Sequence, residues 1–234
     1  MTMRKIALSC MTMAALAAGS ASAATYSLYD QFAISGGAVT AANFAFGFGP
    51  GSYAGADAIS SFTSFELNCD GDVLVQCARA ASGVPGVFKA NGAYDVAGTA
   101  FFDAGELNLH PGPSSEVAIV QFIAPVAGLY TFAGAFSYND IYPTGVDVAA
   151  YVSGVSQIAN AVDAFNFGAT LAAGQKVSFA VGAAGNWTYD STGLALTVTG
   201  PDVGAVPEPG AWAMMILGFG AAGSVLRRRR AALA

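Results

Sequence analysis

The chain has 234 residues, of which 9 are basic and 15 acidic, and it contains 3 cysteines and 1 histidine. Residues 24–205 hold three basic and fourteen acidic side chains, a net charge of −11. A surface this acidic repels phosphate backbones, which excludes nucleic acid as a partner. About 180 residues suffice for one sizeable core, and many Gly, Ala, Phe, Tyr, Val and Thr with few charges predict a single all-β domain.

The first 23 residues have the pattern of a Sec signal peptide. Arg4 and Lys5 form a positive region, residues 6–18 are mostly apolar without charges, and the sequence Ala-Ser-Ala ends the segment. Signal peptidase accepts small residues in this arrangement. We therefore expect signal peptidase to cleave between Ala23 and Ala24.

The first half of the mature chain gives a weak strand pattern. Gly and Ala dilute the alternation between residues 36 and 55, where we expect early strands joined by longer loops. The sequence Gly-Phe-Gly-Pro-Gly at residues 47–51 is interpreted as a loop between strands, because Pro50 and the flanking aromatics do not fit the start of a helix.

Two cysteines, Cys69 and Cys77, remain after signal cleavage. Export brings them to an oxidising compartment, where a disulfide is the expected state. The sequence Asp70-Gly71-Asp72 between them predicts a tight hairpin that brings the two strands together. Metal ligation by the two cysteines, without a matching histidine cluster, is the poorer alternative.

The second half of the chain alternates between apolar and other residues in short runs. The apolar positions of these runs are Tyr130, Phe132 and Phe136, then Val146, Val148 and Val152, then Val177, Phe179 and Val181, and finally Leu194, Leu196 and Val198. Turn-forming clusters at residues 125–128, 142–145 and 172–175 separate the runs. The spacing predicts one β-sandwich over residues 24–200.

Residues 107–201 resemble the jelly roll of bacterial carbohydrate-binding modules. The resemblance rests on LNLHPGPSSEVAIVQFIAPVAGLYTFAGAFSYND, followed by GVDVAAYVSG and by VSFAVGAAGNWTYDSTGLALTVTG. It implies a jelly-roll-like sandwich that acts as a binding module and in which a structural Ca²⁺ is common. The implied binding function rests on analogy at the level of the fold.

Aromatic and polar residues in two loops are candidate ligand-binding residues. Trp187, Tyr189 and Asp190 form one group, and Tyr138 and Tyr142 belong to the other. Flat aromatic rings suit the apolar faces of sugar rings, and short polar side chains suit the hydroxyls. The alternative is that these are ordinary loop aromatics that close the ends of the core.

Metal binding and catalysis find little support in the sequence. Asp140 and Asp147 could bind Ca²⁺ if the loop between them folds back, although solvated carboxylates are the alternative. We expect no other cofactor. The only histidine, His110, has no Gly-x-Ser-x-Gly elbow to accompany it, so no catalytic residues are assigned. Asp103 and Glu106 could in principle serve as the acid and base of a glycosidase.

The C-terminal segment begins with the linker of residues 201–210, which contains Pro207, Glu208 and Pro209. An apolar run of 16 residues, 211–226, follows and would form a helix of about 24 Å, which is marginal for crossing a bilayer. The basic residues Arg227, Arg228, Arg229 and Arg230 predict that residues 227–234 stay on the cytoplasmic side of the membrane.

This tail resembles the PEP-CTERM sorting signal. The features that carry the resemblance are Pro207-Glu208-Pro209, then Trp212-Ala213, the glycine-rich apolar run and the basic end. The resemblance implies that the tail is processed by an exosortase, an integral-membrane enzyme of bacteria that make exopolysaccharide. The alternative is an ordinary single-helix tail anchor.

These features predict an exported protein that passes through the inner membrane to the outer surface or the extracellular matrix. The expected activity is a non-catalytic structural, adhesive or glycan-binding one in association with exopolysaccharide. A Ca²⁺-dependent carbohydrate-binding protein and a secreted hydrolase are the alternative functions.

Overall fold

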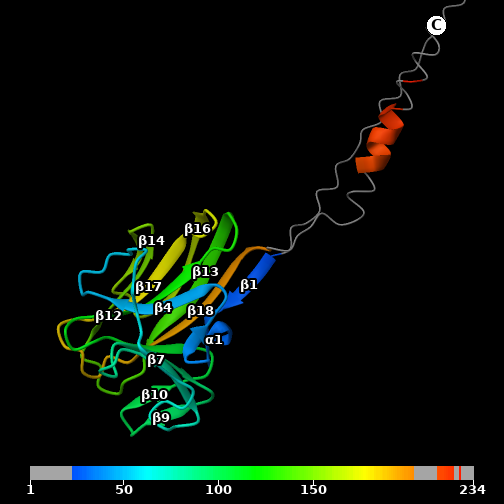
Figure 1. Cartoon of the computed structure of the whole chain (residues 1–234). Helices are drawn as coiled ribbons and strands as arrows, with labels where there is room; N and C mark the ends of the chain where they lie inside the picture. The colour runs from blue at the N-terminus through cyan, green and yellow to red at the C-terminus, as the bar shows by residue number, and fades with distance from the viewer. Residues whose placement is uncertain (1–22, 203–214, 224–226, 228–234) are drawn as a thin grey trace, which may run out of the picture. The chain divides into compact units, whose positions relative to one another are not determined.

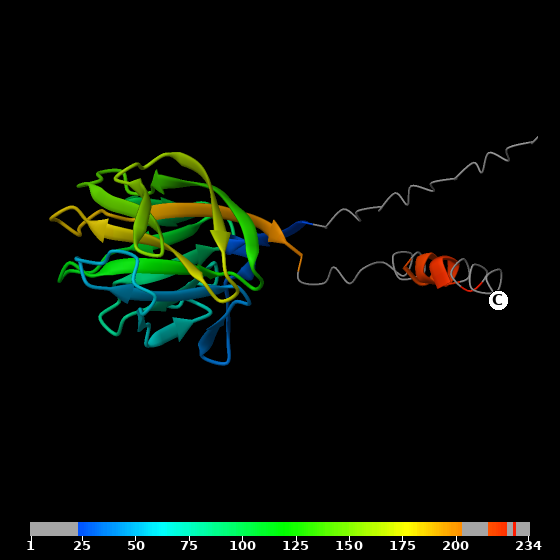
Figure 2. The ribbon, with the colours of Figure 1, turned by 90° about the horizontal axis from the view of Figure 1, so that it is seen from above.

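The computed structural model describes residues 23–202, 215–223 and 227 (Figure 1). One compact unit spans Ala23–Val203, and Met1–Ser22 with Gly204–Ala234 make up the second unit. Apart from one short helix, the regular secondary structure of the compact unit is β-strand, and its two large sheets pack against each other as layers (Figure 2).

The larger sheet has eight strands, all paired antiparallel. Along the sheet they are β16 (Ala164–Leu171), β13 (Gly128–Tyr138), β18 (Thr192–Pro201), β11 (Leu107–His110), β8 (Gly86–Ala90), β7 (Val75–Arg79) and β6 (Ser64–Glu66), while β1 (Ala23–Ser27) also pairs with β18. The strand β18 is therefore bordered by β13 on one side and by β11 and β1 on the other.

The smaller sheet has six antiparallel strands. In order they are β15 (Val155–Ala159), β14 (Val146–Val152), β17 (Lys176–Ala183), β12 (Val117–Ile123), β4 (Phe44–Gly49) and β5 (Ser60–Ser61). Two separate hairpins and one short helix complete the fold: β2 (Ala33–Ser35) with β3 (Ala38–Thr40), β9 (Tyr94–Val96) with β10 (Ala100–Phe102), and α1 (Leu28–Gln31).

The eight strands from β11 to β18 have the topology of a jelly roll. Numbered along the chain from one to eight, they stand in the order one, eight, three, six in the larger sheet and two, seven, four, five in the smaller. This arrangement is the double Greek key. It covers residues 107–201, the range for which the sequence resembles a jelly roll, so the predicted all-β, jelly-roll-like sandwich is confirmed.

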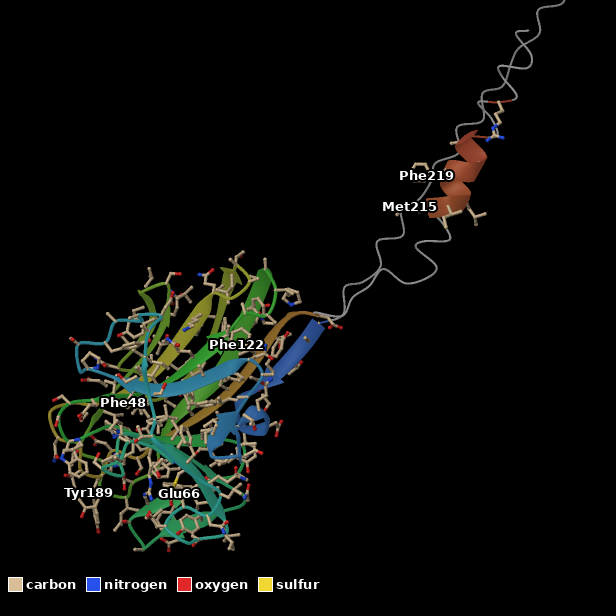
Figure 3. The ribbon with its side chains drawn as sticks, viewed as in Figure 1. Phe48, Glu66, Phe122, Tyr189, Met215 and Phe219 are labelled. Atoms are coloured by element: carbon tan, nitrogen blue, oxygen red, sulfur yellow. A yellow bond between two sulfur atoms is a disulfide. The ribbon has the colours of Figure 1, made fainter. Side chains whose placement is uncertain are left out.

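The core lies between the two sheets and is rich in aromatic rings. Phe122 of β12 is completely buried, and its ring lies 5.4–5.6 Å from those of Tyr26, Phe44, Tyr130 and Phe132 (Figure 3). Full burial of such a side chain stabilises the fold by about 1.5–3 kcal/mol. Because Tyr26, Tyr130 and Phe132 belong to the larger sheet, these contacts join the two layers.

The predicted alternation of the second half is confirmed. The apolar positions that the sequence predicted for the core face of β13, β17 and β18 are at most 4% exposed, and in β14 Val146 and Val148 are buried whereas Val152 is half-buried. Tyr130 also fixes the turn that leads into its strand, since its hydroxyl donates a hydrogen bond to the carbonyl of Val126 at 2.7 Å.

The interpretation of residues 47–51 as a loop is wrong for its first three residues. Gly47, Phe48 and Gly49 belong to β4, which pairs with β12 along Phe44–Gly49. A side chain at Gly47 would collide with the carbonyl oxygen of Ser60 in the neighbouring β5. The glycine is thus required for the close approach of two strands, and it hides the strand pattern in the sequence.

The two ends of the compact unit lie side by side. In the pairing of β1 with β18, Ala23 faces Pro201 and Ala24 faces Gly200. The predicted signal cleavage after Ala23 would therefore remove one residue from the end of this strand and leave the remaining pairs in place. The cleavage site itself stays a prediction.

Residues 215–223 of the tail are helical, and the side chains of Met215 and Phe219 are exposed. Within the parts of the chain that the structure describes, no helix has the length and apolar character needed to cross a membrane. The membrane-spanning helix proposed for residues 211–226 stays a prediction, and residues 211–214 and 224–226 lie outside the described residues.

Candidate functional site

A cleft of about 680 Å³ lies on the larger sheet at the end where β18 begins. Strands β7, β8 and β11 contribute residues to its floor, and the hairpin β9–β10, the turn at residues 69–72 and the loop at residues 187–191 form its walls. A volume of this size is typical of small-molecule sites. Figure 3 labels Tyr189 of the 187–191 loop and Glu66 near the disulfide, both at this end of the domain.

The floor is the face of the larger sheet that points away from the core. Leu107 and Leu109 of β11 belong to the core, so by the alternation of a strand Asn108 and His110 point to the opposite face. Phe88, which lies directly across from Asn108 on β8, also lines the cleft. Its ring centroid is 6.1 Å from that of Phe102 in β10, which joins the floor to the hairpin.

Asn108 is the unusual residue of the floor. It is only 2% exposed, yet neither its amide nitrogen nor its oxygen has a hydrogen-bond partner among the described residues. Leaving a buried polar group without a partner costs about 1–3 kcal/mol. Such a group at the bottom of a cleft is suited to bind an incoming polar ligand.

Aromatic rings form the wall of the 187–191 loop. Trp187 is 38% exposed and packs edge-on against the imidazole of His110, with the ring centroids 6.0 Å apart. Tyr189 is 41% exposed and has a φ of 62°, a left-handed conformation that is rare for a bulky residue. The loop thus holds two partly exposed rings beside the floor, at a local conformational cost.

His110 has a defined tautomer. Its Nδ1 lies 2.8 Å from the carbonyl oxygen of Pro111, and because a carbonyl can only accept a hydrogen bond, the proton is on Nδ1. The Nε2 atom of the neutral ring is then an acceptor. His110 is one of the residues that line the cleft, so this acceptor belongs to the polar groups of the site.

Backbone hydrogen bonds tie the hairpin and the aromatic loop together through residues 139–141. Phe101 donates to the carbonyl of Asn139, and Ile141 donates to that of Thr99. Asp140 lines the cleft and accepts a hydrogen bond from the backbone of Ser191. These bonds hold the walls of the cleft at fixed positions over the sheet.

The opposite wall is held by the disulfide between Cys69 and Cys77, which confirms the predicted pairing. The predicted hairpin is also present, because Asp70 and Gly71 have φ values of 51° and 86° and Asp72 donates its backbone N–H to the carbonyl of Cys69. Cys69 and the following three residues line the cleft.

Arg79 fixes this turn from outside. Its Nη2 atom lies 2.9 Å from Oε1 of Glu66 and 2.6 Å from Oδ1 of Asp70. Hydrogen bonds from Ser64 and Arg79 lower the pKa of Glu66, and the hydrogen bond from Arg79 lowers the pKa of Asp70. Both carboxylates are therefore charged at neutral pH.

The cleft is acidic. The carboxylates of Asp70, Asp72 and Asp140 line it, and the described lining contains no lysine or arginine. Tyr94, another lining residue, donates a hydrogen bond to Asp72, and this bond together with burial raises the pKa of its hydroxyl. The wall therefore combines negative charge with a hydroxyl that keeps its proton.

The structure brings some of the candidate ligand-binding residues together. Trp187 and Tyr189 line the cleft, and Tyr142 packs edge-on against Tyr189 with the ring centroids 6.3 Å apart. Asp190 is completely buried and accepts a hydrogen bond from Thr144, so it lies behind the cleft wall. Tyr138 is 48% exposed on β13 and is not one of the lining residues.

The proposed Ca²⁺ pair gains no support. Asp140 lies in the cleft, where Ser191 binds one of its oxygens, whereas Asp147 is an exposed residue of β14 in the other sheet. Among the described residues, the only close group of three or more metal-ligating side chains is Glu66, Cys69 and Cys77, whose two sulfurs form the disulfide. The calcium site stays a prediction.

Sequence reasoning missed the floor of the cleft. Asn108, His110 and Phe88 were not identified as candidate ligand-binding residues. One signal was present in the sequence: LNLH places polar residues at alternate positions of a strand that is otherwise apolar. An alternating polar face indicates a surface outside the core, but only the position of the hairpin above it turns that face into a cleft.

Comparison with known proteins places the tail in a defined class. Residues 205–230 match the profile of the PEP-CTERM protein-sorting motif. The chain is therefore an exported protein that is sorted by an exosortase and passes through the membrane to the cell surface. The sorting residues Pro207, Glu208, Pro209, Trp212 and Arg228 to Arg230 lie outside the described residues, whereas Arg227 is described as helical and exposed.

The rest of the chain has weaker similarities. A search of curated sequences finds no match. The secreted serine protease VesC from Vibrio cholerae is 12% identical, with a TM-score of 0.30 over 41% of this chain and 20% of that one. A GH26-CBM35 β-(1,4)-mannanase from Podospora anserina is 14% identical, with a TM-score of 0.26 over 50% of this chain and 26% of that one. These scores are too low to support an inference.

Proposed function

We propose that this exported protein is a non-catalytic glycan-binding module that attaches to exopolysaccharide at the cell surface or in the extracellular matrix. The observation that carries the proposal is the cleft, in which Trp187 and Tyr189 present partly exposed rings above a floor that includes the polar side chains of Asn108 and His110. Aromatic rings beside hydrogen-bonding groups match the mixed apolar and polar faces of a sugar ring. A structural or adhesive role would use the same contact between the cleft and the polysaccharide.

The position of the cleft suits this role. It lies where β18 begins, at Thr192, whereas the chain continues toward the sorting tail from Pro201 at the other end of this strand. Ten residues of strand span about 30 Å. A domain held through its C-terminal end would therefore carry the cleft well away from its point of attachment.

The proposed processing follows the boundaries of the compact unit. Signal peptidase would remove residues 1–23, and the exosortase would act in the linker of residues 201–210. Until then residues 211–226 would span the inner membrane, with the basic residues 227–234 on the cytoplasmic side. The compact unit begins at Ala23 and ends at Val203, so the first step would remove only its first residue, and a cut after Pro209 would fall outside it.

A non-catalytic role fits the carboxyl groups around the cleft. Burial raises the pKa of Asp190, which is the property of a general acid, but this side chain is completely buried and does not line the cleft. Asp103 and Glu106 do not line it either, and Glu106 accepts hydrogen bonds from Ser137 and Asn139.

The proposal is tested by the binding of the exported protein to exopolysaccharide from the bacterium that makes it. Replacing Trp187 or Tyr189 by alanine should weaken binding about tenfold or more, because a tenfold change needs only about 1.4 kcal/mol and burying the apolar surface of an aromatic side chain contributes about 1.5–3 kcal/mol. Leu129→Ala is the matched control, because Leu129 is 66% exposed and lies outside the cleft. Equal binding by all three variants and the unmodified protein would refute the proposal.

A further inference from the structure

The side chains that line the cleft also indicate which class of saccharide it would bind. We propose that the cleft selects an uncharged saccharide, bound through neighbouring hydroxyl groups by Asn108, and rejects acidic saccharides such as uronates. The inference rests on the proposed glycan-binding function and specifies which glycans the same site accepts.

Asn108 provides the first argument. A carboxamide offers two N–H donors on its nitrogen and an acceptor on its oxygen, and here all of these lack partners in the described part of the protein. A hydroxyl group can both donate and accept. Two hydroxyls on adjacent ring carbons can therefore satisfy both ends of the amide at once, one as acceptor and one as donor.

The placement of the rings supports this mode of binding. His110 lies two residues after Asn108 on the same face of β11, a separation of about 6.7 Å along a strand, and Trp187 packs against His110. A sugar ring against Trp187 would thus project its hydroxyls over the floor toward Asn108. The adjacent Nε2 of His110 would accept a further hydroxyl hydrogen.

Charge provides the argument against acidic saccharides. Asp70, Asp72 and Asp140 line the cleft, and Arg79 already pairs with Asp70 and with Glu66. Neither lysine nor arginine is present among the described lining residues to pair with a ligand carboxylate. Bringing a uronate next to these aspartates costs Coulomb energy, most of all where the walls exclude water.

The test uses pairs of saccharides that differ only at carbon six. Oligomers of mannose, glucose and galactose are compared with the corresponding uronates of the same linkage, and binding to the exported protein is measured by calorimetry or ligand-observed NMR. We expect at least one neutral member to bind and its uronate to bind about tenfold more weakly or worse. Added salt should narrow this difference, because it screens the aspartates.

Three variants test the named residues. Asn108→Leu should weaken binding of the neutral saccharide about tenfold while leaving the melting temperature equal or higher, since it removes an unpaired buried amide. Asp72→Asn keeps an oxygen for the backbone N–H of Leu74 and should reduce the discrimination against the uronate. Asp103→Asn makes the same change in charge outside the cleft and should leave the discrimination unchanged.

The outcomes separate this inference from the proposed function. Equal or tighter binding of the uronate would overturn the inference and leave glycan binding in place. Full binding of the neutral saccharide by Asn108→Leu would overturn the assigned role of the amide. If no member of any pair binds and the bacterial exopolysaccharide does not bind either, both proposals fail.

Discussion

At the scale of single residues, a glycine fixes how closely β18 packs on its neighbours. A side chain at Gly200 would collide with the ring of Tyr130, which is completely buried and held by its hydrogen bond to Val126. Gly200→Ala should therefore lower the free energy of unfolding by about 1–3 kcal/mol. Urea denaturation of the exported protein measures the change.

The control for this variant is Gly168, which lies in β16 at the edge of the same sheet. At Gly168 in β16 an added methyl group would have its nearest neighbour 3.7 Å away, which is an ordinary contact. Gly168→Ala should leave stability equal or raise it slightly, because alanine loses less conformational entropy on folding. Equal losses at both positions would show that the collision with Tyr130 is not the cause.

Arg79 gives a second prediction at this scale, one that depends on pH. Pairing with Arg79 lowers the pKa values of Glu66 and Asp70, so their contribution to stability is complete above the pKa values of the unfolded chain. It is lost as the pH falls through the lower folded values. Arg79→Met should cost about 0.5–1 kcal/mol at pH 7, since both carboxylates are partly exposed, and much less at pH 3. A constant difference from pH 7 to pH 3 would contradict this assignment.

At the scale of elements, the disulfide stabilises the turn that forms one wall of the cleft. Cys69 and Cys77 close a loop with a sequence separation of 8, which stabilises the fold by about 2–3 kcal/mol in the chain-entropy account. Replacing both cysteines by serine should lower stability by this amount and weaken saccharide binding, because Cys69, Asp70 and Asp72 would no longer be held in place. Reductant should bring the unmodified protein to the same stability and leave the variant unchanged.

The elements also show how far sequence reasoning reaches. Strands β13, β17 and β18 were predictable because one face of each packs on the core, so large apolar residues recur at alternate positions of each strand. Strand β4 was not, since Gly47 and Gly49 serve close contacts and carry no apolar side chain. The alternation of apolar residues within a strand indicates which of its faces is buried. Close packing between strands depends instead on residues that lie far apart in the chain.

The candidate site was predictable to a similar extent. Trp187 and Tyr189 were identified because aromatic rings beside short polar side chains in a turn suit the apolar faces and the hydroxyls of a sugar. Asn108 and Phe88 were not identified, because their role arises from the pairing of β11 with β8 and from the hairpin β9–β10 that covers them. These relations join segments far apart in sequence, and a single sequence does not reveal them.

At the scale of the whole molecule, the paired ends of the compact unit connect export with folding. Ala24 pairs with Gly200, so a chain cut after Ala23 keeps β1 in the sheet. A cut in the linker after residue 201 likewise spares β18. Both processing steps can therefore act on the folded domain, and we expect the exported protein to have an intact mass that lacks residues 1–23 and the region after Pro209.

The sorting tail gives the last prediction. From the sequence we expect the prolines at 207 and 209 to keep the segment around Glu208 extended and outside any helix, and an extended segment is what a processing enzyme can bind. Replacing Pro207, Glu208 and Pro209 by alanine should leave an uncleaved chain in the inner membrane, detected by cell fractionation and intact mass. Gly204→Ala in the same linker is the control and should be released normally. Normal release of the triple variant would mean that the exosortase does not read this tripeptide, and the link to the extracellular matrix would lose its main support.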